Sequence, residues 1–185
     1  MRVLIPFLLT LTNGCDTHVP RTPVTANPLD PDALDEMSRA AKASVPIVGG
    51  TMITGAASGQ FIAADPDNDT MLFWRKGYDT ASVTQLEQGD MPTRLVMDDE
   101  GKVHVILRGT GELVTLDSQT QQVTNRARVC NLPRGIDFGA DGTLSVACAE
   151  GKLIRVDPYT LQSLDLTTLP DDLRDVVVEG PVRYV

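Results

Sequence analysis

The chain has 185 residues, of which 42% are hydrophobic and only 4% aromatic, so we expect one domain with a core of aliphatic side chains. Its formal net charge is −9 at pH 7, and its largest basic clusters are Arg75-Lys76 and the spaced pair Arg126 and Arg128. Nucleic-acid binding needs clustered Lys and Arg to neutralise phosphates, so this composition excludes a nucleic-acid partner from our expectations.

The first fifteen residues have the pattern of an export signal. Arg2 precedes an apolar run over 3–11, which has the length of a signal-peptide core and is too short to cross a bilayer. Residues 1–15 resemble a bacterial lipoprotein signal, which is cut before a cysteine that then carries lipid, although Thr12 stands where Leu is usual. We therefore expect a lipid on Cys15 to anchor the protein to a membrane of the bacterial cell envelope, on its periplasmic or outer side. Plain secretion is the alternative.

The other two cysteines also bear on whether the protein is exported. If Cys15 takes lipid, Cys130 and Cys148 remain as a pair. An exported protein meets an oxidising compartment in which a disulfide persists, and the alternative is two separate buried thiols. Their spacing fits no zinc site, and the chain has no C-x-x-C-H haem-attachment motif, so we predict no metal and no cofactor.

The next two segments precede the main domain. Residues 16–32 are rich in proline and are predicted to form a tether, in which His18 is solvated. Residues 33–44 are predicted to form a short helix, with Leu34 and Met37 on one face.

From residue 45 the chain has the character of β-structure, with short strands separated by turns. A unit beginning at Pro92 recurs from Pro133, 41 residues later. In the two copies we expect first strands at 94–97 and 134–138 and second strands at 103–107 and 144–148. Third strands are expected at 113–116 and 153–156, and weaker fourth strands at 122–129 and 161–167. Four antiparallel strands in about 41 residues make one blade of a β-propeller.

The predicted fold is thus an all-β propeller of four-stranded antiparallel blades over 45–185. The blades fall at about 50–90, 91–131 and 132–172, and a fourth begins at 173–185, so about three and a half blades are present. A closed ring needs more blades. We therefore expect the chain to be the N-terminal part of a longer protein, with the pairing of two such arcs as the alternative.

The repeat resembles the YVTN-type propeller repeat. The matching elements are V-H-V-I-L at 103–107, L-V-T-L-D-S-Q-T at 113–120 and P-R-G-I-D-F-G-A-D-G at 133–142. The resemblance covers 50–185 and is strongest over 91–167. It implies a closed propeller, often seven-bladed, in exported bacterial proteins that serve as interaction surfaces or as the propeller half of redox and haem proteins. The motif is structural, so the resemblance implies no catalytic residue.

Few polar groupings suggest a site. The run Asp65 to Asp69 begins like a calcium loop, but Thr70 and Lys76 stand where that loop needs Gly and Glu, so we expect an acidic hairpin turn. His104 is the one His after residue 18 and cannot form a Ser-His-Asp set by itself, so a structural role is expected. Trp74 and Tyr78 are expected to pack.

Three arginines recur near the start of successive units, namely Arg94, Arg134 and Arg174. They could form a basic ring at a channel mouth, attractive to an anion, or bridge neighbouring blades by pairing with Asp98 or Asp137. We favour the bridging role.

These observations predict an exported, lipid-anchored propeller that binds or supports an unidentified protein or small-molecule partner, without catalysis of its own. Two alternatives remain. One is the propeller half of an exported haem-containing oxidoreductase whose cytochrome domain lies downstream. The other is a propeller hydrolase or lactonase with a metal in the channel.

Overall fold

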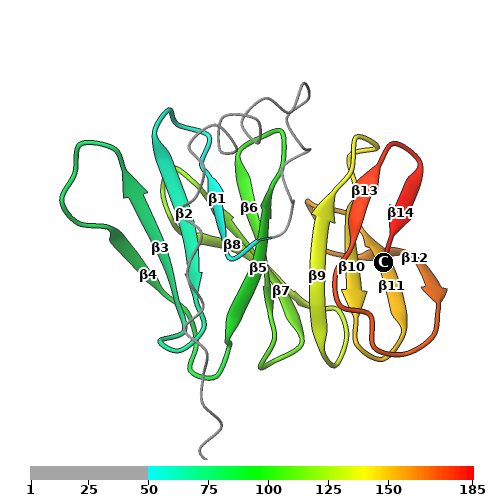
Figure 1. Ribbon diagram of the computed structural model, residues 1–185. Coiled ribbons are helices and arrows are strands. Elements are labelled where there is room, and N and C mark those ends of the chain that lie inside the picture. The colour runs from blue at the N-terminus through cyan, green and yellow to red at the C-terminus, as the bar shows by residue number, and fades with distance from the viewer. Residues whose placement is uncertain (1–49) are drawn as a thin grey trace, which may run out of the picture. The chain divides into compact units, whose positions relative to one another are not determined.

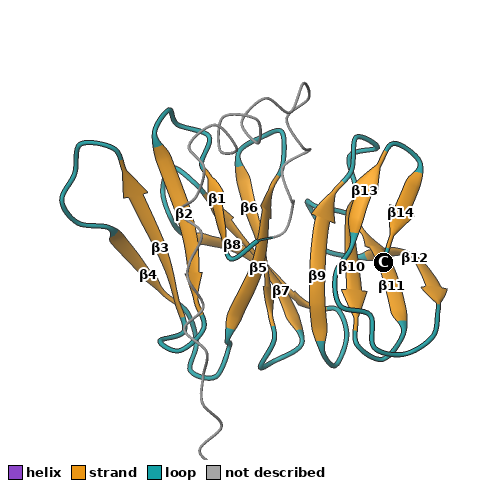
Figure 2. Ribbon diagram, in the orientation of Figure 1, coloured by secondary structure: helices purple, strands orange, loops and turns teal. Residues whose placement is uncertain are grey.

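The computed structural model of this protein describes residues 50–185. All regular structure in that part of the chain is β, in fourteen strands (Figures 1 and 2). The predicted signal peptide with Cys15, the tether with His18 and the helix at 33–44 lie outside the described residues. Among residues 50–185, no helix long and apolar enough to cross a membrane is found.

Twelve of the strands form three four-stranded antiparallel sheets, each in simple chain order. The first sheet contains β1 (Met52–Thr54), β2 (Gln60–Asp65), β3 (Thr70–Arg75) and β4 (Ser82–Gln85). The second contains β5 (Pro92–Met97), β6 (Lys102–Leu107), β7 (Glu112–Asp117) and β8 (Val123–Arg128). The third contains β9 (Pro133–Phe138), β10 (Leu144–Cys148), β11 (Lys152–Val156) and β12 (Ser163–Thr168).

The remaining two strands form a hairpin, in which β13 (Val177–Glu179) pairs with β14 (Val182–Tyr184). In Figure 1 this hairpin stands beside β9 and β10, in the place where a fourth sheet would begin. The predicted all-β fold of four-stranded blades is therefore confirmed, with three sheets and the first two strands of another in the described chain. The first strands begin at Pro92 and Pro133, slightly earlier than expected.

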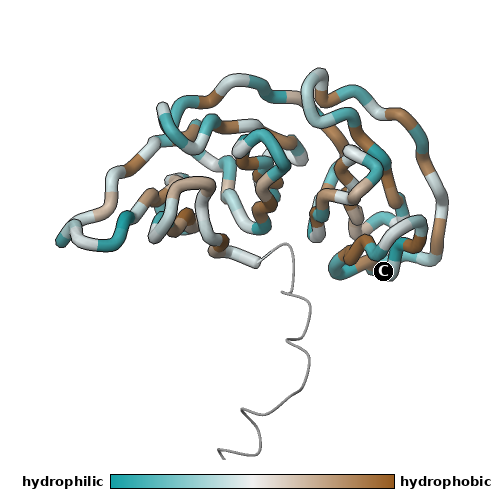
Figure 3. Tube along the Cα trace, turned by 90° about the horizontal axis from the view of Figure 1, so that it is seen from above, coloured by the Kyte–Doolittle hydropathy of each residue, from teal (hydrophilic) through white to brown (hydrophobic). Residues whose placement is uncertain are grey.

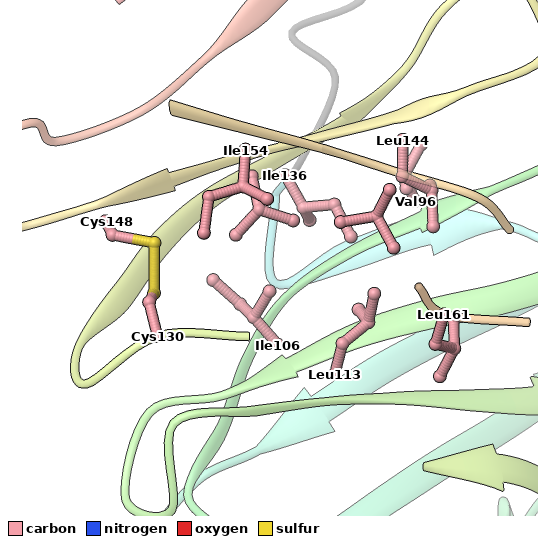
Figure 4. Packing of buried hydrophobic residues seen from close by; sticks show 11 residues of the cluster. Val96, Ile106, Leu113, Cys130, Ile136, Leu144, Cys148, Ile154 and Leu161 are labelled. Carbon is pink, nitrogen blue, oxygen red and sulfur yellow. A yellow bond between two sulfur atoms is a disulfide. The ribbon is translucent and has the colours of Figure 1, made fainter. Parts of the chain in front are cut away.

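The core lies between consecutive sheets, because each strand presents alternate side chains to its two neighbours. Val103 and Val105 of β6 pack toward the first sheet, whereas Ile106 of the same strand packs toward the third. Figure 3 shows hydrophobic and hydrophilic stretches interspersed along the trace. Figure 4 shows Ile106 and Leu113 facing Ile136 and Ile154 across the interface between the second and third sheets.

The recurring Asp-x-x-Thr turns have one common geometry. Asp117 Oδ1 accepts hydrogen bonds from the backbone N–H groups of Gln119 and Thr120, at 2.9 and 2.8 Å. Asp157 Oδ1 accepts the equivalent bonds from Tyr159 and Thr160, at 3.0 and 2.8 Å. An Asp that binds the backbone two and three residues ahead stabilises such a turn, which explains why the repeat has Asp there.

A buried ion-pair cluster holds the link between the first and second sheets. Asp90 is fully buried in this link, and its carboxylate accepts two hydrogen bonds from Arg126 of β8, at 2.6 and 3.0 Å. Glu112 of β7 also pairs with Arg126. The hydrogen bond to Asp90, followed by that to Glu112, holds the pKa of Arg126 above its usual value, so Arg126 remains charged.

Candidate functional site

The three recurring arginines do not form a common site. Arg94 Nη2 lies 3.0 Å from Asp175 Oδ2 and so connects β5 with the segment that leads into β13. Arg174 pairs with Asp172, two residues earlier, and both side chains are exposed. The Nε atom of Arg134 is buried and has no hydrogen-bond partner among the described residues.

The register explains this difference. Leu95 lies opposite Val105, and Ile136 lies opposite Val146, so Arg94 corresponds to Gly135 rather than to Arg134. The expected partners are also engaged elsewhere. Asp98 bonds to His104, and Asp137 accepts a hydrogen bond from the backbone N–H of Val178, at 2.6 Å. Arg94 therefore connects the second sheet with the segment before β13, and its partner is Asp175 rather than Asp98 or Asp137.

His104 is fully buried and bonded at both ring nitrogens. Its Nδ1 lies 3.0 Å from Thr115 Oγ1, and its Nε2 lies 3.1 Å from Asp98 Oδ2. Burial acts to raise the pKa of Asp98, but hydrogen bonds from His104 and from the backbone of Lys102 outweigh it, so the pKa lies below its usual value. Since Asp98 and Thr115 are buried as well, this trio joins three strands and does not face a ligand.

The acidic run of the first sheet forms the β2–β3 hairpin turn. Asp65 Oδ1 accepts hydrogen bonds from the backbone N–H groups of Asp67 and Asn68, at 3.2 and 3.3 Å. The carboxylate of Asp69 accepts hydrogen bonds from Gly89 and Met91, in the link to β5. These carboxylates thus satisfy the backbone of two loops and do not converge on one point.

Cys130 and Cys148 are joined in a disulfide, with their Cα atoms 6.4 Å apart (Figure 4). The bond connects the link before β9 with the end of β10. Glu150 has a carboxylate oxygen within 4.8 Å of both sulfur atoms. A metal would require free thiolates, and because both sulfur atoms are in the disulfide this group is not a metal site.

A hollow of about 450 Å³ opens where the first and second sheets meet. Its walls come from residues 73–75, 78 and 80–82 of β3, β4 and their connecting loop, from Gln60 of β2, and from Gln119 and Gln121 of the β7–β8 turn. We call it the Trp74 hollow. It combines aromatic and polar side chains in one lining.

Hydrogen bonds hold these walls in place. Gln60 Nε2 donates to the carbonyl of Ser118, at 2.9 Å, and so ties β2 to the β7–β8 turn. Thr84 Oγ1 donates to the carbonyl of Gln121, at 2.7 Å, across the same junction. Trp74 Nε1 donates to the carbonyl of Tyr78, at 2.8 Å, which fixes the start of the β3–β4 loop.

The lining of the hollow contains no acidic side chain, although the chain as a whole is acidic. The chain contains 25 acidic residues, yet none of the lining residues is Asp or Glu, and Arg75 is the one charged member. Trp74 also packs against Phe61, with ring centroids 5.5 Å apart and the ring planes tilted by 40°. Trp74 and Tyr78 were expected to pack, and Trp74 does so, but both also line the hollow.

The glutamines of the hollow were not predicted from the sequence. Gln60 and Gln121 are 61 positions apart, and no motif distinguishes them from other glutamines. Only the packing of the first sheet on the β7–β8 turn brings them to one site.

No family model matches this sequence, and no curated protein sequence matches it. Solved structures do resemble the fold. A streptogramin B lyase structure aligns with a TM-score of 0.59 and 13% identity, over 72% of this chain and 46% of that chain. The hydrazine synthase of Kuenenia stuttgartiensis aligns with a TM-score of 0.61 and 14% identity, over 75% of this chain and 41% of that chain. The WD40 β-propeller domain of Doa1 aligns with a TM-score of 0.60 and 16% identity, over 68% of this chain and 43% of that chain.

These likenesses and the sheet order define the class: the described chain has a β-propeller fold, with three blades and the beginning of another. The chain spans less than half the length of these structural neighbours. At such low identity the likeness concerns the fold alone, because one propeller fold serves unrelated functions.

Proposed function

We propose that this chain is an exported, lipid-anchored β-propeller module of a bacterial cell envelope that binds a partner. The observation that carries the proposal is the disulfide between Cys130 and Cys148, taken with a leader that ends on Cys15. Disulfides persist in oxidising compartments and are rare in a reducing cytosol. The resemblance of the repeat to the YVTN type, which occurs in exported bacterial proteins, supports the same location.

The role of binding is supported by how the polar side chains are used. His104, Asp98 and Thr115 have the residue types of a catalytic trio, but they are buried and bonded to one another. The Trp74 hollow, in contrast, is open to solvent and has walls held by hydrogen bonds. A preformed concave surface with few charges suits a ligand or a peptide better than it suits bond breaking.

Lipid attachment tests the anchoring. The full chain is expressed in a Gram-negative bacterial host fed a radioactive or clickable fatty acid, beside Cys15→Ser. We expect label on the wild-type chain, in the membrane fraction, and none on the variant. An unlabelled wild-type chain that keeps its first fifteen residues would overturn the anchoring.

The state of the other cysteines tests the export independently. In the same host, a thiol-alkylating reagent is applied to denatured protein before and after reduction. Exported protein should expose Cys130 and Cys148 to the reagent only after reduction. Free thiols at both positions in unreduced protein would contradict export.

A further inference from the structure

The Trp74 hollow carries an inference about the kind of ligand. Its volume, about 450 Å³, falls within the range of roughly 300–1,000 Å³ that is usual for small-ligand sites. It joins two blades, and the hydrogen bonds from Gln60 to Ser118 and from Thr84 to Gln121 close its walls across the junction. A ligand therefore meets a site that exists before it binds, which lowers the entropic cost of binding.

The neutral side chains of the hollow suit a ligand with many hydroxyl groups. Gln119, Gln121 and Thr80 each carry both donors and acceptors, as adjacent sugar hydroxyls do. Tyr78 leaves 63% of its surface exposed beside them. An aromatic side chain with a polar tip covers the C–H face of a sugar ring while its hydroxyl reaches the rim.

Among ligands with many hydroxyl groups, the positive charge of Arg75 favours those that also carry a negative charge. Arg75 is exposed and makes no ion pair with any residue of 50–185 that the structure describes. No carboxylate belongs to the lining, so Arg75 is the one charge among the lining residues, while the exposed Asp79 lies between Tyr78 and Thr80 in the same loop. A guanidinium matches a carboxylate with two parallel hydrogen bonds, which favours a planar carboxylate over a neutral group.

We propose that the Trp74 hollow binds a saccharide with a carboxylated sugar unit, such as a uronate, whose carboxylate pairs with Arg75. The sugar ring lies against the aromatic wall, and its hydroxyls bond to the glutamine and threonine side chains. The inference rests on the proposed binding role of the module and names the class of its ligand.

The chain contains one tryptophan, and it lies in the wall of the hollow, so its emission reports directly on this site. The full chain in mild detergent is titrated with digalacturonate, with a neutral disaccharide of the same size and with an aliphatic dicarboxylate. We expect a saturable change in Trp74 emission with digalacturonate. The neutral disaccharide and the dicarboxylate should each bind about tenfold more weakly or worse, because each lacks one half of the recognition.

Arg75→Gln should weaken the binding of digalacturonate about tenfold, since it removes the charge and keeps a polar side chain. Arg174→Gln is the matched control, because Arg174 is also exposed but lies before β13, far from the hollow, and this variant should bind as the wild type does. Thermal melts of both variants check that they fold. No saturable change with digalacturonate, equal binding of either comparison ligand, or undiminished binding by Arg75→Gln would each overturn the inference. The lipid-labelling result does not affect this titration, so the two proposals fail separately.

Discussion

His104 shows how one residue can stabilise a blade without taking part in chemistry. Ile62 of the first sheet and Ser145 of the third occupy the corresponding places on β2 and β10. Where the first sheet buries an apolar side chain, the second buries an imidazole that needs two partners. Asp98 and Thr115 supply them, so the three polar groups are satisfied together.

Replacing His104 with Ala should therefore destabilise the fold by about 2–4 kcal/mol, because it opens a cavity and removes the partner of two buried oxygens, Thr115 Oγ1 and Asp98 Oδ2. Urea denaturation followed by circular dichroism measures the change. Arg174→Gln, at an exposed position, should stay within about 0.5 kcal/mol of the wild type. A His104→Ala variant as stable as the wild type would contradict the structural role.

Asp117 links a turn to a charge pair. The hydrogen bond from Lys102, at 2.7 Å, together with those from the backbone of Thr120 and Gln119, lowers the pKa of Asp117 far below its usual value of 3.8. A carboxyl group whose folded pKa is lowered stabilises the fold above its unfolded pKa and loses that contribution as the pH falls toward the folded pKa.

We accordingly expect the melting temperature of the wild type to fall as the pH drops below about 4. Asp117→Asn should melt lower than the wild type at pH 7, and the difference between the two should shrink steadily from pH 4 to pH 2. Melting curves at closely spaced pH values test this. If the difference stays constant across that range, ionised Asp117 makes no contribution to stability.

At the scale of the element, the β6–β7 turn shows why the repeat contains glycine at fixed places. Gly111 has a φ of 75°, which favours glycine, and a Cβ there would clash with the carbonyl oxygen of Cys130. The backbone N–H groups of Val129 and Cys130 both bond to its carbonyl. The turn therefore serves as the support for the link to the next blade.

Gly142 offers a matched comparison for this turn. It has a φ of 73°, but a Cβ there would meet nothing within 4 Å. Gly142→Ala should cost about 1 kcal/mol, the strain of the left-handed backbone alone. Gly111→Ala should cost clearly more, about 2–4 kcal/mol, since the clash adds to the same strain. Equal losses of unfolding free energy would show that the close approach to Cys130 is unimportant.

At the scale of the whole molecule, each hydrophobic core belongs to two sheets. Ile106 is fully buried and lies in the cluster that contains Ile136 and Val146 of the third sheet. Neighbouring sheets of this kind stabilise one another as the units of a repeat protein do. A defect at one interface should thus affect the two sheets that share it.

Ile106→Ala should destabilise the fold by about 2–5 kcal/mol. Hydrogen exchange followed by mass spectrometry should show faster exchange in β6 and in β10, with a smaller effect in β2. Faster exchange confined to β6 would mean that the sheets unfold independently, against the shared core.

Local physics made much of this architecture predictable. The strands and their turns recur about every 41 residues, and they can be predicted because alternation and turn chemistry depend on neighbours within a few positions. The side chains of Val105 and Ile106 point to opposite faces of the sheet because side chains alternate along a β-strand. The structural role of His104, in contrast, follows from its burial and from the bonds at both ring nitrogens.

The tertiary structure alone decided the rest. The pairing of Arg94 with Asp175 joins residues 81 positions apart, and no sequence pattern marks them as partners. The Trp74 hollow depends on the stacking of one blade on the turn of the next. Side chains separated by dozens of residues meet there because sheets pack through their faces, and such contacts are not encoded by local spacing.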